Sequence, residues 1–161
     1  MITKGNKIKD SKDILSSIRR IAFQVYEINI EEEYLVIVGV GDRGGLLSEM
    51  LGQALVSISD LKLKYVNLTI DKAKPYNNIK SNVSLENLKN QSIVIVDDVL
   101  NTGSTLIHAV SYFLQIPVKQ IKTAVMVNRN HKKFPIKADF KIITKKKSIK
   151  NIAAELENLL A

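Results

Sequence analysis

The sequence SIVIVDDVLNTGST, residues 92–105, decides the fold. Its first part, residues 92–96, is short, continuous and β-branched, which is typical of a strand buried on both faces. This strand is predicted to end in Asp97 and Asp98, after which residues 102–104 open a helix that runs to about residue 115. A buried strand that leads through a polar turn into a helix is the unit from which parallel α/β sheets are built.

The rest of the chain repeats this alternation of strands and helices. Further strands are predicted at residues 34–40, 64–70, 121–127 and 140–143, and further helices at 11–28, 46–58 and 149–160. The first helix has Asp10 or Ser11 as its cap and a set of apolar residues at helical spacing: Ile14, Leu15, Ile18, Ile21, Ala22, Val25 and Ile28. Ser148 is the predicted cap of the last helix. A glycine-rich turn at residues 41–45 separates the strand at 34–40 from the helix at 46–58.

Length and composition indicate one domain over residues 1–161, with 45% hydrophobic and 25% charged residues. The chain has no cysteine, which excludes disulfides, thiolate metal sites and a cysteine nucleophile. It shows no apolar signal segment and no apolar run of membrane-spanning length. We therefore expect a cytoplasmic protein without membrane contact.

Positive charge gathers in one segment of the chain. The net charge is +8, and residues 119–150 hold ten lysines and Arg129 against the single acid Asp139, a local sum of +10. Such a block attracts polyanions, including RNA and phosphorylated substrates, without selecting one of them. A lysine-rich solvated surface explains the block equally well.

The two halves of the 92–105 stretch suggest two kinds of ligand contact. A helix N-terminus offers unpaired backbone N–H groups, so a turn with Gly103 for close approach and hydroxyls beside it can hold a phosphate. Carboxylates at Asp97 and Asp98 can accept hydrogen bonds from ribose hydroxyls or hold a hydrated Mg²⁺ ion. Together they indicate a receptor for a ribose 5-phosphate. For either half alone, a helix cap or a pair of solvated acids is the simpler explanation.

Two other phosphate-handling sites also place paired acids at a strand end. One is the Walker B segment of nucleotidases, but the accompanying pattern G-x-x-x-x-G-K-[ST] is absent from the sequence. The other is the acidic pocket of phospho-acceptor domains, which has no need of the threonine-glycine turn.

The sequence at this point resembles a known family. Residues 97–105 resemble the signature for phosphoribosyl pyrophosphate (PRPP) in type I phosphoribosyltransferases, two acids followed by a threonine-glycine turn. Residues 37–45, IVGVGDRGG, are similar to the pyrophosphate loop of that family. Residues 127–139, VNRNHKKFPIKAD, are similar to a segment of the pyrimidine operon attenuation protein/uracil phosphoribosyltransferase group. With the sequence RRIA at residues 19–22, the similarity covers residues 18–144 in order.

The resemblance implies the type I phosphoribosyltransferase fold, a central mainly parallel sheet flanked by helices, with a mobile hood loop at about residues 71–90. It also implies roles for single residues. Asp97 and Asp98 would contact the ribose hydroxyls, directly or through water on Mg²⁺, the implied cofactor. The 5-phosphate would be held by Asn101, Thr102, Gly103, Ser104 and Thr105. Arg43 would bind the pyrophosphate, with the backbone N–H groups of Asp42 and Gly44 in support.

The hood would cover the reacting centre and exclude water. Its first residues offer Asp71, Lys72 and Lys74 as catalytic candidates beside Arg43, although the related group carries an arginine in this segment and this chain does not. The implied reaction transfers the phosphoribosyl group of PRPP to a nucleobase, a pyrimidine such as uracil, and releases pyrophosphate. The implied pathway is pyrimidine salvage.

The nucleobase would be bound by Asn128, Arg129 and His131. Asn101 stands where purine-salvage relatives carry an aspartate, which disfavours a purine acceptor. The resemblance also implies a homodimer or a larger assembly, with the helix at 11–28 or the closing helix as a possible contact.

Two alternatives stay open. One is an RNA-binding regulator that responds to PRPP or nucleotides, with the same fold and little catalytic activity. In the basic block, however, lysines outnumber arginines ten to one, and only Phe134 and Phe140 can stack on bases. The other alternative is a non-catalytic partner subunit.

Overall fold

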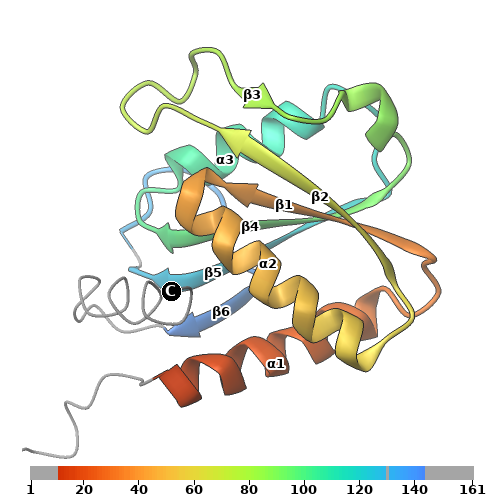
Figure 1. Cartoon of the computed structure of the whole chain (residues 1–161). Helices are drawn as coiled ribbons and strands as arrows, with labels where there is room; N and C mark the ends of the chain where they lie inside the picture. The colour runs from red at the N-terminus through yellow and green to blue at the C-terminus, as the bar shows by residue number, and fades with distance from the viewer. Residues whose placement is uncertain (1–10, 130, 144–161) are drawn as a thin grey trace, which may run out of the picture.

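The computed structural model describes residues 11–129 and 131–143, which form a six-stranded sheet in the order β3-β2-β1-β4-β5-β6 (Figure 1). The strands are β1 (Tyr34–Val40), β2 (Lys62–Thr69), β3 (Lys80–Ser81), β4 (Ser92–Leu100), β5 (Gln120–Asn128) and β6 (Phe140–Ile143). Every neighbouring pair is parallel except β2 and β3, which are antiparallel. The mainly parallel α/β sheet predicted from the sequence is confirmed.

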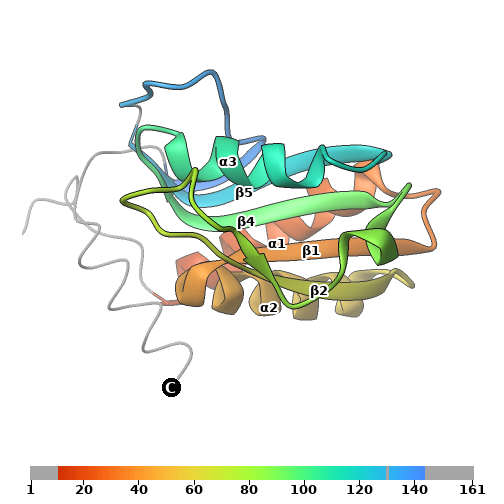
Figure 2. The same cartoon turned by 90° about the horizontal axis from the view of Figure 1, so that it is seen from above.

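Helices cover both faces of the sheet. Helices α1 (Ser11–Ile28) and α2 (Gly41–Ile58) lie on one face, and α3 (Ser104–Phe113) lies on the other, as the edge-on view in Figure 2 shows. Successive side chains of a strand point to opposite faces. In β4, Val94 and Val96 accordingly join the core under α1 and α2, whereas Ile93 and Ile95 join the core under α3. This explains the continuous β-branched sequence of the central strands.

Helix α1 buries the apolar stripe that its spacing predicts, with two exceptions at its margin. Five of the predicted residues are buried against the sheet: Ile14, Ile18, Ile21, Ala22 and Val25. Leu15 and Ile28, which share the apolar spacing, are 49% and 41% exposed and do not join the buried stripe. Leu15 lies about 100° around the helix from Ile14, which places it outside the stripe that reaches the sheet.

Three predicted boundaries need correction at the edge of the sheet where the strands end. Strand β4 does not end at the two aspartates, as predicted, but continues to Leu100, because its pairing with β5 continues to Leu100 opposite Asn128. Helix α2 begins at Gly41, so the glycine-rich turn predicted at 41–45 forms its first turn. Strand β2 begins and ends slightly earlier than the predicted 64–70.

The predicted hood loop at 71–90 is more structured than its polar sequence suggests. Residues 80–81 form β3 on the edge of the sheet, and Leu85–Leu88 form a short 3-10 helix, η2. Leu88 is fully buried and joins the core under α3. The irregular part is therefore confined to about residues 71–79.

The predicted helix at 149–160, its Ser148 cap and the alternative cap Asp10 lie outside the described residues. Within the described ranges, no helix is both long enough and apolar enough to cross a membrane.

Candidate functional site: a phosphate loop beside two buried acids

The centre of the site is the acid pair in the last half of β4. Asp97 is 2% exposed and Asp98 is 8% exposed. Oδ1 of Asp97 accepts a hydrogen bond of 2.8 Å from the backbone N–H of Asp98, and Oδ1 of Asp98 accepts one of 2.8 Å from the N–H of Val99. The strand backbone thus holds both carboxylates at the carboxyl edge of the sheet, where open α/β sheets bind ligands.

The two acids titrate differently because their surroundings differ. Burial raises the pKa of Asp97 well above its ordinary value, and its hydrogen bond and charge interaction with Asp98 raise it further. Burial also acts to raise the pKa of Asp98. The hydrogen bond from Asp97, the charge of Lys72 and the N–H of Val99 outweigh burial there, so the pKa of Asp98 is lowered. Asp98 is therefore the member of the pair that stays ionised most readily.

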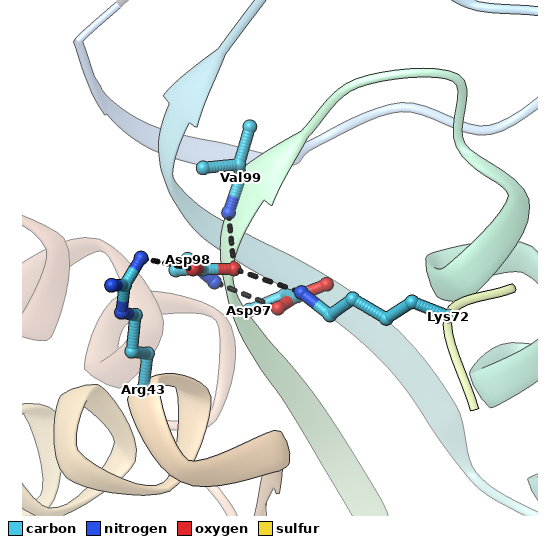
Figure 3. Close-up of polar contacts among 5 residues, drawn as sticks. All are labelled: Arg43, Lys72, Asp97, Asp98 and Val99. Atoms are coloured by element: carbon cyan, nitrogen blue, oxygen red, sulfur yellow. Dashed lines mark hydrogen bonds and ion pairs between the residues drawn. The ribbon is translucent and has the colours of Figure 1, made fainter. Parts of the chain in front are cut away.

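Two cations from different elements meet Asp98, and Figure 3 shows them approaching from opposite sides. Nη1 of Arg43, in the first turn of α2, lies 3.8 Å from Oδ2 of Asp98. Nζ of Lys72, in the segment after β2, lies 3.5 Å from Oδ1 of Asp98. Both side chains are about half exposed, so each can also reach a ligand in front of the acids.

Arg43 reaches Asp98 because the first turn of α2 lies directly on the end of β4. A Cβ atom on Gly44 would stand 2.7 Å from the carbonyl oxygen of Val96, closer than real Cβ contacts allow. Only glycine permits this approach. The glycine at 44 thus sets the separation between the α2 and β4 parts of the site.

The phosphate loop predicted at residues 101–105 lines a pocket of about 380 Å³ at the start of α3. Lys72 and Asp98 lie at the same pocket, together with all five predicted loop residues: Asn101, Thr102, Gly103, Ser104 and Thr105. Gly103 has φ +89°, a left-handed conformation that favours glycine, and Oγ1 of Thr102 accepts a 3.2 Å bond from the N–H of Ser104. The open end of α3 faces a space large enough for a phosphate group.

The other predicted residues are distributed around this pocket. Asp42 lines a second hollow of about 510 Å³ at the start of α2. Oδ1 of Asp71 accepts bonds from the N–H groups of Ala73, at 2.9 Å, and Lys74, at 3.4 Å, so this carboxylate holds the local turn. Of the three hood candidates, Lys72 is the one whose ion pair with the acid pair is recorded in the described structure.

The predicted nucleobase residues follow the end of β5. Asn128 is buried and stands opposite Leu100 of β4, and the N–H of Arg129 donates a 2.9 Å bond to the carbonyl of Leu100. Nε of Arg129 is buried and has no hydrogen-bond partner in the described part of the chain. His131 is exposed. The structure therefore brings Asn128 and Arg129 next to the acid strand and leaves His131 at the surface.

The sequence analysis did not identify the residues that pack against the phosphate loop on the side away from the pocket. Phe134 and Ile136 contact the phosphate loop, and Asp139 anchors the same segment to Thr123 of β5 through a 2.9 Å bond from the Thr123 N–H to Oδ2 of Asp139. The one available signal was the occurrence of two apolar residues inside an otherwise basic, polar segment.

Comparison with known proteins agrees with this geometry. Residues 4–158 match the phosphoribosyl transferase domain family. The chain is 34% identical over 149 residues to a bifunctional protein PyrR of Fusobacterium nucleatum, covering 87% of this chain and 84% of the relative. It is 32% identical over 143 residues to a bifunctional protein PyrR of Leuconostoc mesenteroides, covering 84% and 82%.

Solved structures show the same fold at lower identity. A mutant hypoxanthine phosphoribosyltransferase of Trypanosoma cruzi, complexed with the product IMP, superposes with a TM-score of 0.75 at 15% identity, covering 88% of this chain and 72% of that one. A second structure of the enzyme from that organism gives 0.73 at 16% identity, covering 83% and 78%. The resemblance inferred from the sequence is confirmed, and the chain belongs to the phosphoribosyl transferase domain family, with the bifunctional PyrR proteins among its relatives.

Proposed function

We propose that the protein transfers the phosphoribosyl group of PRPP to a pyrimidine nucleobase such as uracil and releases pyrophosphate. One observation carries this proposal: a buried acid pair lies beside a helix N-terminus that can hold a phosphate, and two cations that can hold a second anion flank the pair. Those are the contacts that a ribose with phosphate groups at both ends requires.

Each part of PRPP has a residue set suited to it. The loop from Asn101 to Thr105 binds the 5-phosphate through backbone N–H groups and hydroxyls at the start of α3. Asp97 and Asp98 accept hydrogen bonds from the ribose hydroxyls. The low pKa of Asp98 suits this acceptor role, since an ionised carboxylate has no proton to donate.

The pyrophosphate lies between α2 and the hood. Arg43 binds it with the planar fork of the guanidinium, and the N–H groups of Asp42 and Gly44 assist at the start of α2. Lys72 supplies a second positive charge from the hood. Asp71 and Lys74 complete this end of the hood, Asp71 by holding the turn that presents Lys72.

Mg²⁺ fits the donor set of this site. Carboxylate oxygens are ligands that Mg²⁺ prefers, and the ion commonly takes only one or two carboxylates from a protein and the rest from water and substrate phosphates. Asp97 and Asp98 would hold the ion, mainly through water, and the bound ion would offset the negative charge of the pyrophosphate.

The reaction is a displacement at C1 of the ribose. The bond from C1 to the pyrophosphate oxygen breaks, and its electron pair leaves with the pyrophosphate. The lone pair of a base nitrogen forms the new C1–N bond, and the proton of that nitrogen passes to water. Positive charge builds up on the ribose ring in the transition state, as in glycoside cleavage. The protein contributes by holding both reactants in line and by stabilising the leaving group.

The base site lies at the end of β5, at Asn128, Arg129 and His131. The buried Nε donor of Arg129 is suited to a carbonyl oxygen of a pyrimidine, because a buried donor gains most from an added acceptor. Asn101 lines the phosphate pocket and has no carboxylate to accept a proton from a purine nitrogen. The second feature favours a pyrimidine, whereas the first does not discriminate, because hypoxanthine and guanine also carry a carbonyl oxygen.

A second activity, binding of RNA, is supported by the surface of the segment after β5. Four lysines of this segment are exposed: Lys132, Lys133, Lys137 and Lys141. A cluster of exposed lysines is the electrostatic signature of nucleic-acid binding. We place both activities in the cytoplasm and in a homodimer or a larger assembly, the state that analytical ultracentrifugation measures directly.

The test is product formation from PRPP, Mg²⁺ and single nucleobases, followed by mass spectrometry. We expect uridine monophosphate from uracil and no product from the variant Asp97→Asn/Asp98→Asn. A panel that includes cytosine, hypoxanthine and guanine identifies the acceptor. A purine nucleotide as the main product would contradict the pyrimidine assignment. Failure to form any nucleotide from the whole panel would reject the enzyme and leave the RNA-binding regulator as the remaining hypothesis.

A further inference from the structure

The segment of residues 131–136 lies against the phosphate loop and is bonded to it through the backbone. The N–H groups of Lys133 and Phe134 both donate to the carbonyl of Thr102, at 2.8 and 3.2 Å. The N–H of Arg129 donates to the carbonyl of Leu100 at 2.9 Å. The carbonyl groups of Leu100 and Thr102 are thus held by hydrogen bonds from Arg129, in the proposed base site, and from Lys133 and Phe134.

Side chains of the same segment brace the loop at Gly103. A Cβ atom built on Gly103 would clash with Cγ2 of Ile136 and would stand 3.7 Å from Cβ of Phe134. Ile136 therefore lies directly against the Cα of the one loop residue with a left-handed backbone. Glycine has access to many backbone conformations, so a loop turning at Gly103 needs an outside contact to remain in one of them.

Phe134 extends this contact to His108 of α3. Its ring meets the ring of His108 edge to face, with centroids 6.5 Å apart and an angle of 72°. Nδ1 of His108 lies 2.7 Å from the carbonyl oxygen of Ser104, to which the protonated nitrogen donates. The segment thus touches both the loop and the helix end that would receive the phosphate.

The far end of the segment is also anchored. Oγ1 of Thr123 in β5 donates to the carbonyl of Lys137 at 2.6 Å, and Oδ2 of Asp139 accepts a bond from the N–H of Thr123. Arg129 is held at Leu100, and residues 133–139 are held at the phosphate loop and at β5, so these residues form a bridge between the proposed base site and the phosphate loop. A conformational change at the proposed base site can therefore be transmitted through these residues to the phosphate loop, and the reverse.

We propose that Phe134 and Ile136 are positioning residues that hold the phosphate loop in its binding conformation and couple it to the base site. This inference rests on the proposed function for the identity of the two ligands. A base bound beside Asn128 and Arg129 restrains the bridge and raises the affinity of the loop for a sugar phosphate. By thermodynamic linkage, a bound sugar phosphate raises the affinity for the base by the same factor. The site therefore favours a ligand that carries both groups, a nucleoside 5-monophosphate, over either fragment.

The first test measures binding of ribose 5-phosphate by isothermal titration calorimetry to the wild-type protein and to Ile136→Ala. We expect the variant to bind about tenfold more weakly, since a loop that occupies its binding conformation only part of the time has an apparent affinity reduced by that fraction. Ile116→Ala is the matched control, because Ile116 is also half-buried against the core under α3 and has no recorded contact with the phosphate loop. We expect this control to bind ribose 5-phosphate within about twofold of the wild type, and Ile136→Val to recover most of the lost affinity.

The second test separates coupling from simple damage to the loop. Titration of ribose 5-phosphate is repeated with saturating uracil, and the ratio of the two affinities is compared between proteins. The ratio should exceed one in the wild type and in Ile116→Ala, and should fall to one in Ile136→Ala and Phe134→Ala. Equal binding of ribose 5-phosphate by the wild type and Ile136→Ala, or an unchanged ratio, would overturn the inference alone. A wild-type protein that binds no ribose 5-phosphate would overturn the proposed function, and this inference with it.

Discussion

The two ends of β4 each carry a buried polar cluster, and the clusters are opposite in character. At the amino end, Ser92 donates to Oδ1 of Asn29 at 2.6 Å, and Nε2 of Gln120 reaches both of these groups, at 3.2 and 3.1 Å. At the carboxyl end, Asp97 and Asp98 place two acids side by side with as little exposure to water. The groups of the amino-end cluster are uncharged and hydrogen-bonded to one another. The carboxyl-end cluster places two acidic side chains next to each other.

The difference separates the end of β4 that is suited to binding a ligand from the end that contributes to stability. Buried neutral groups with matched partners contribute about 1 kcal/mol per hydrogen bond and lock α1 to the start of the sheet. Buried acids beside each other oppose folding, as the raised pKa of Asp97 reports. The carboxyl end of β4 therefore carries a destabilising acid pair that is suited to ligand binding. Its amino end carries a hydrogen-bond network that stabilises the fold.

The largest expected effect is on catalysis at the carboxyl end. Asp98→Asn removes the ionised acceptor and the shared partner of Arg43 and Lys72, so we expect kcat/KM with PRPP to fall at least about 100-fold, the scale for loss of one preorganised electrostatic contact. Steady-state kinetics measures this. Ser92→Ala, at the other end of the same strand, should keep kcat/KM within about twofold. A loss below tenfold for Asp98→Asn would remove the contrast between the two ends.

The next effect is on stability at the amino end. Asn29→Ala leaves Ser92 and Gln120 without their shared acceptor, so we expect the free energy of unfolding to fall by about 2–3 kcal/mol. Urea denaturation followed by circular dichroism measures the loss. Ser92→Ala is the milder comparison, because Gln120 can still donate to Asn29, and should cost about 1 kcal/mol. Equal losses in the two variants would show that Asn29 is not the centre of the cluster.

The smallest effect is a gain in stability from Asp97→Asn. The folded-state pKa of Asp97 is raised, so the folded protein binds a proton more tightly than the unfolded chain does. Its contribution to stability is therefore present at low pH and is lost as pH rises through the raised pKa. The variant has no ionisable group at this position, so it does not lose stability in this way as pH rises. Its melting temperature should therefore exceed that of the wild type at neutral pH.

The size of this gain in melting temperature and its dependence on pH distinguish it from other stabilising effects. Each kcal/mol recovered raises the melting temperature by about 2–4 °C in a domain of this size. The gain should shrink as pH falls toward 3.8, the ordinary aspartate value, and thermal melts at several pH values measure it. A gain that grows toward acid pH would reverse the proposed sign.

Much of the fold followed from residues 92–105, because a buried strand, paired acids and a helix start are local patterns. The end of β4 lies two residues beyond the predicted end at Asp97 and Asp98, since a polar acid pair before a turn is typical of a strand end. Here pairing with β5 carries both acids inside the sheet. The 71–90 segment was taken as one loop because the apolar residues of η2 have no regular period, yet Leu88 is buried by tertiary contacts alone.

The site was predictable in its parts but not in its assembly. The threonine-glycine turn and the acids are adjacent in sequence, so their chemistry can be inferred together. The contact of Ile136 with Gly103 joins residues far apart in the chain and depends on how the segment after β5 crosses the loop. No local pattern encodes such a crossing. The pairing of Lys72 with Asp98 likewise requires the path of the chain between β2 and β3.

The tight contact of Gly44 with the end of β4 has a consequence for turnover. It joins Arg43 and the acid pair into one rigid part, so neither can move away from the other to admit or release a ligand. Lys72 belongs to a different part, since residues 71–77 are held by two turns closed within that segment itself, from Lys74 to Asp71 and from Asn77 to Lys74. Under the proposed function, we therefore expect substrate to enter and pyrophosphate to leave by movement of this segment, and we expect its opening to limit the rate of each catalytic cycle.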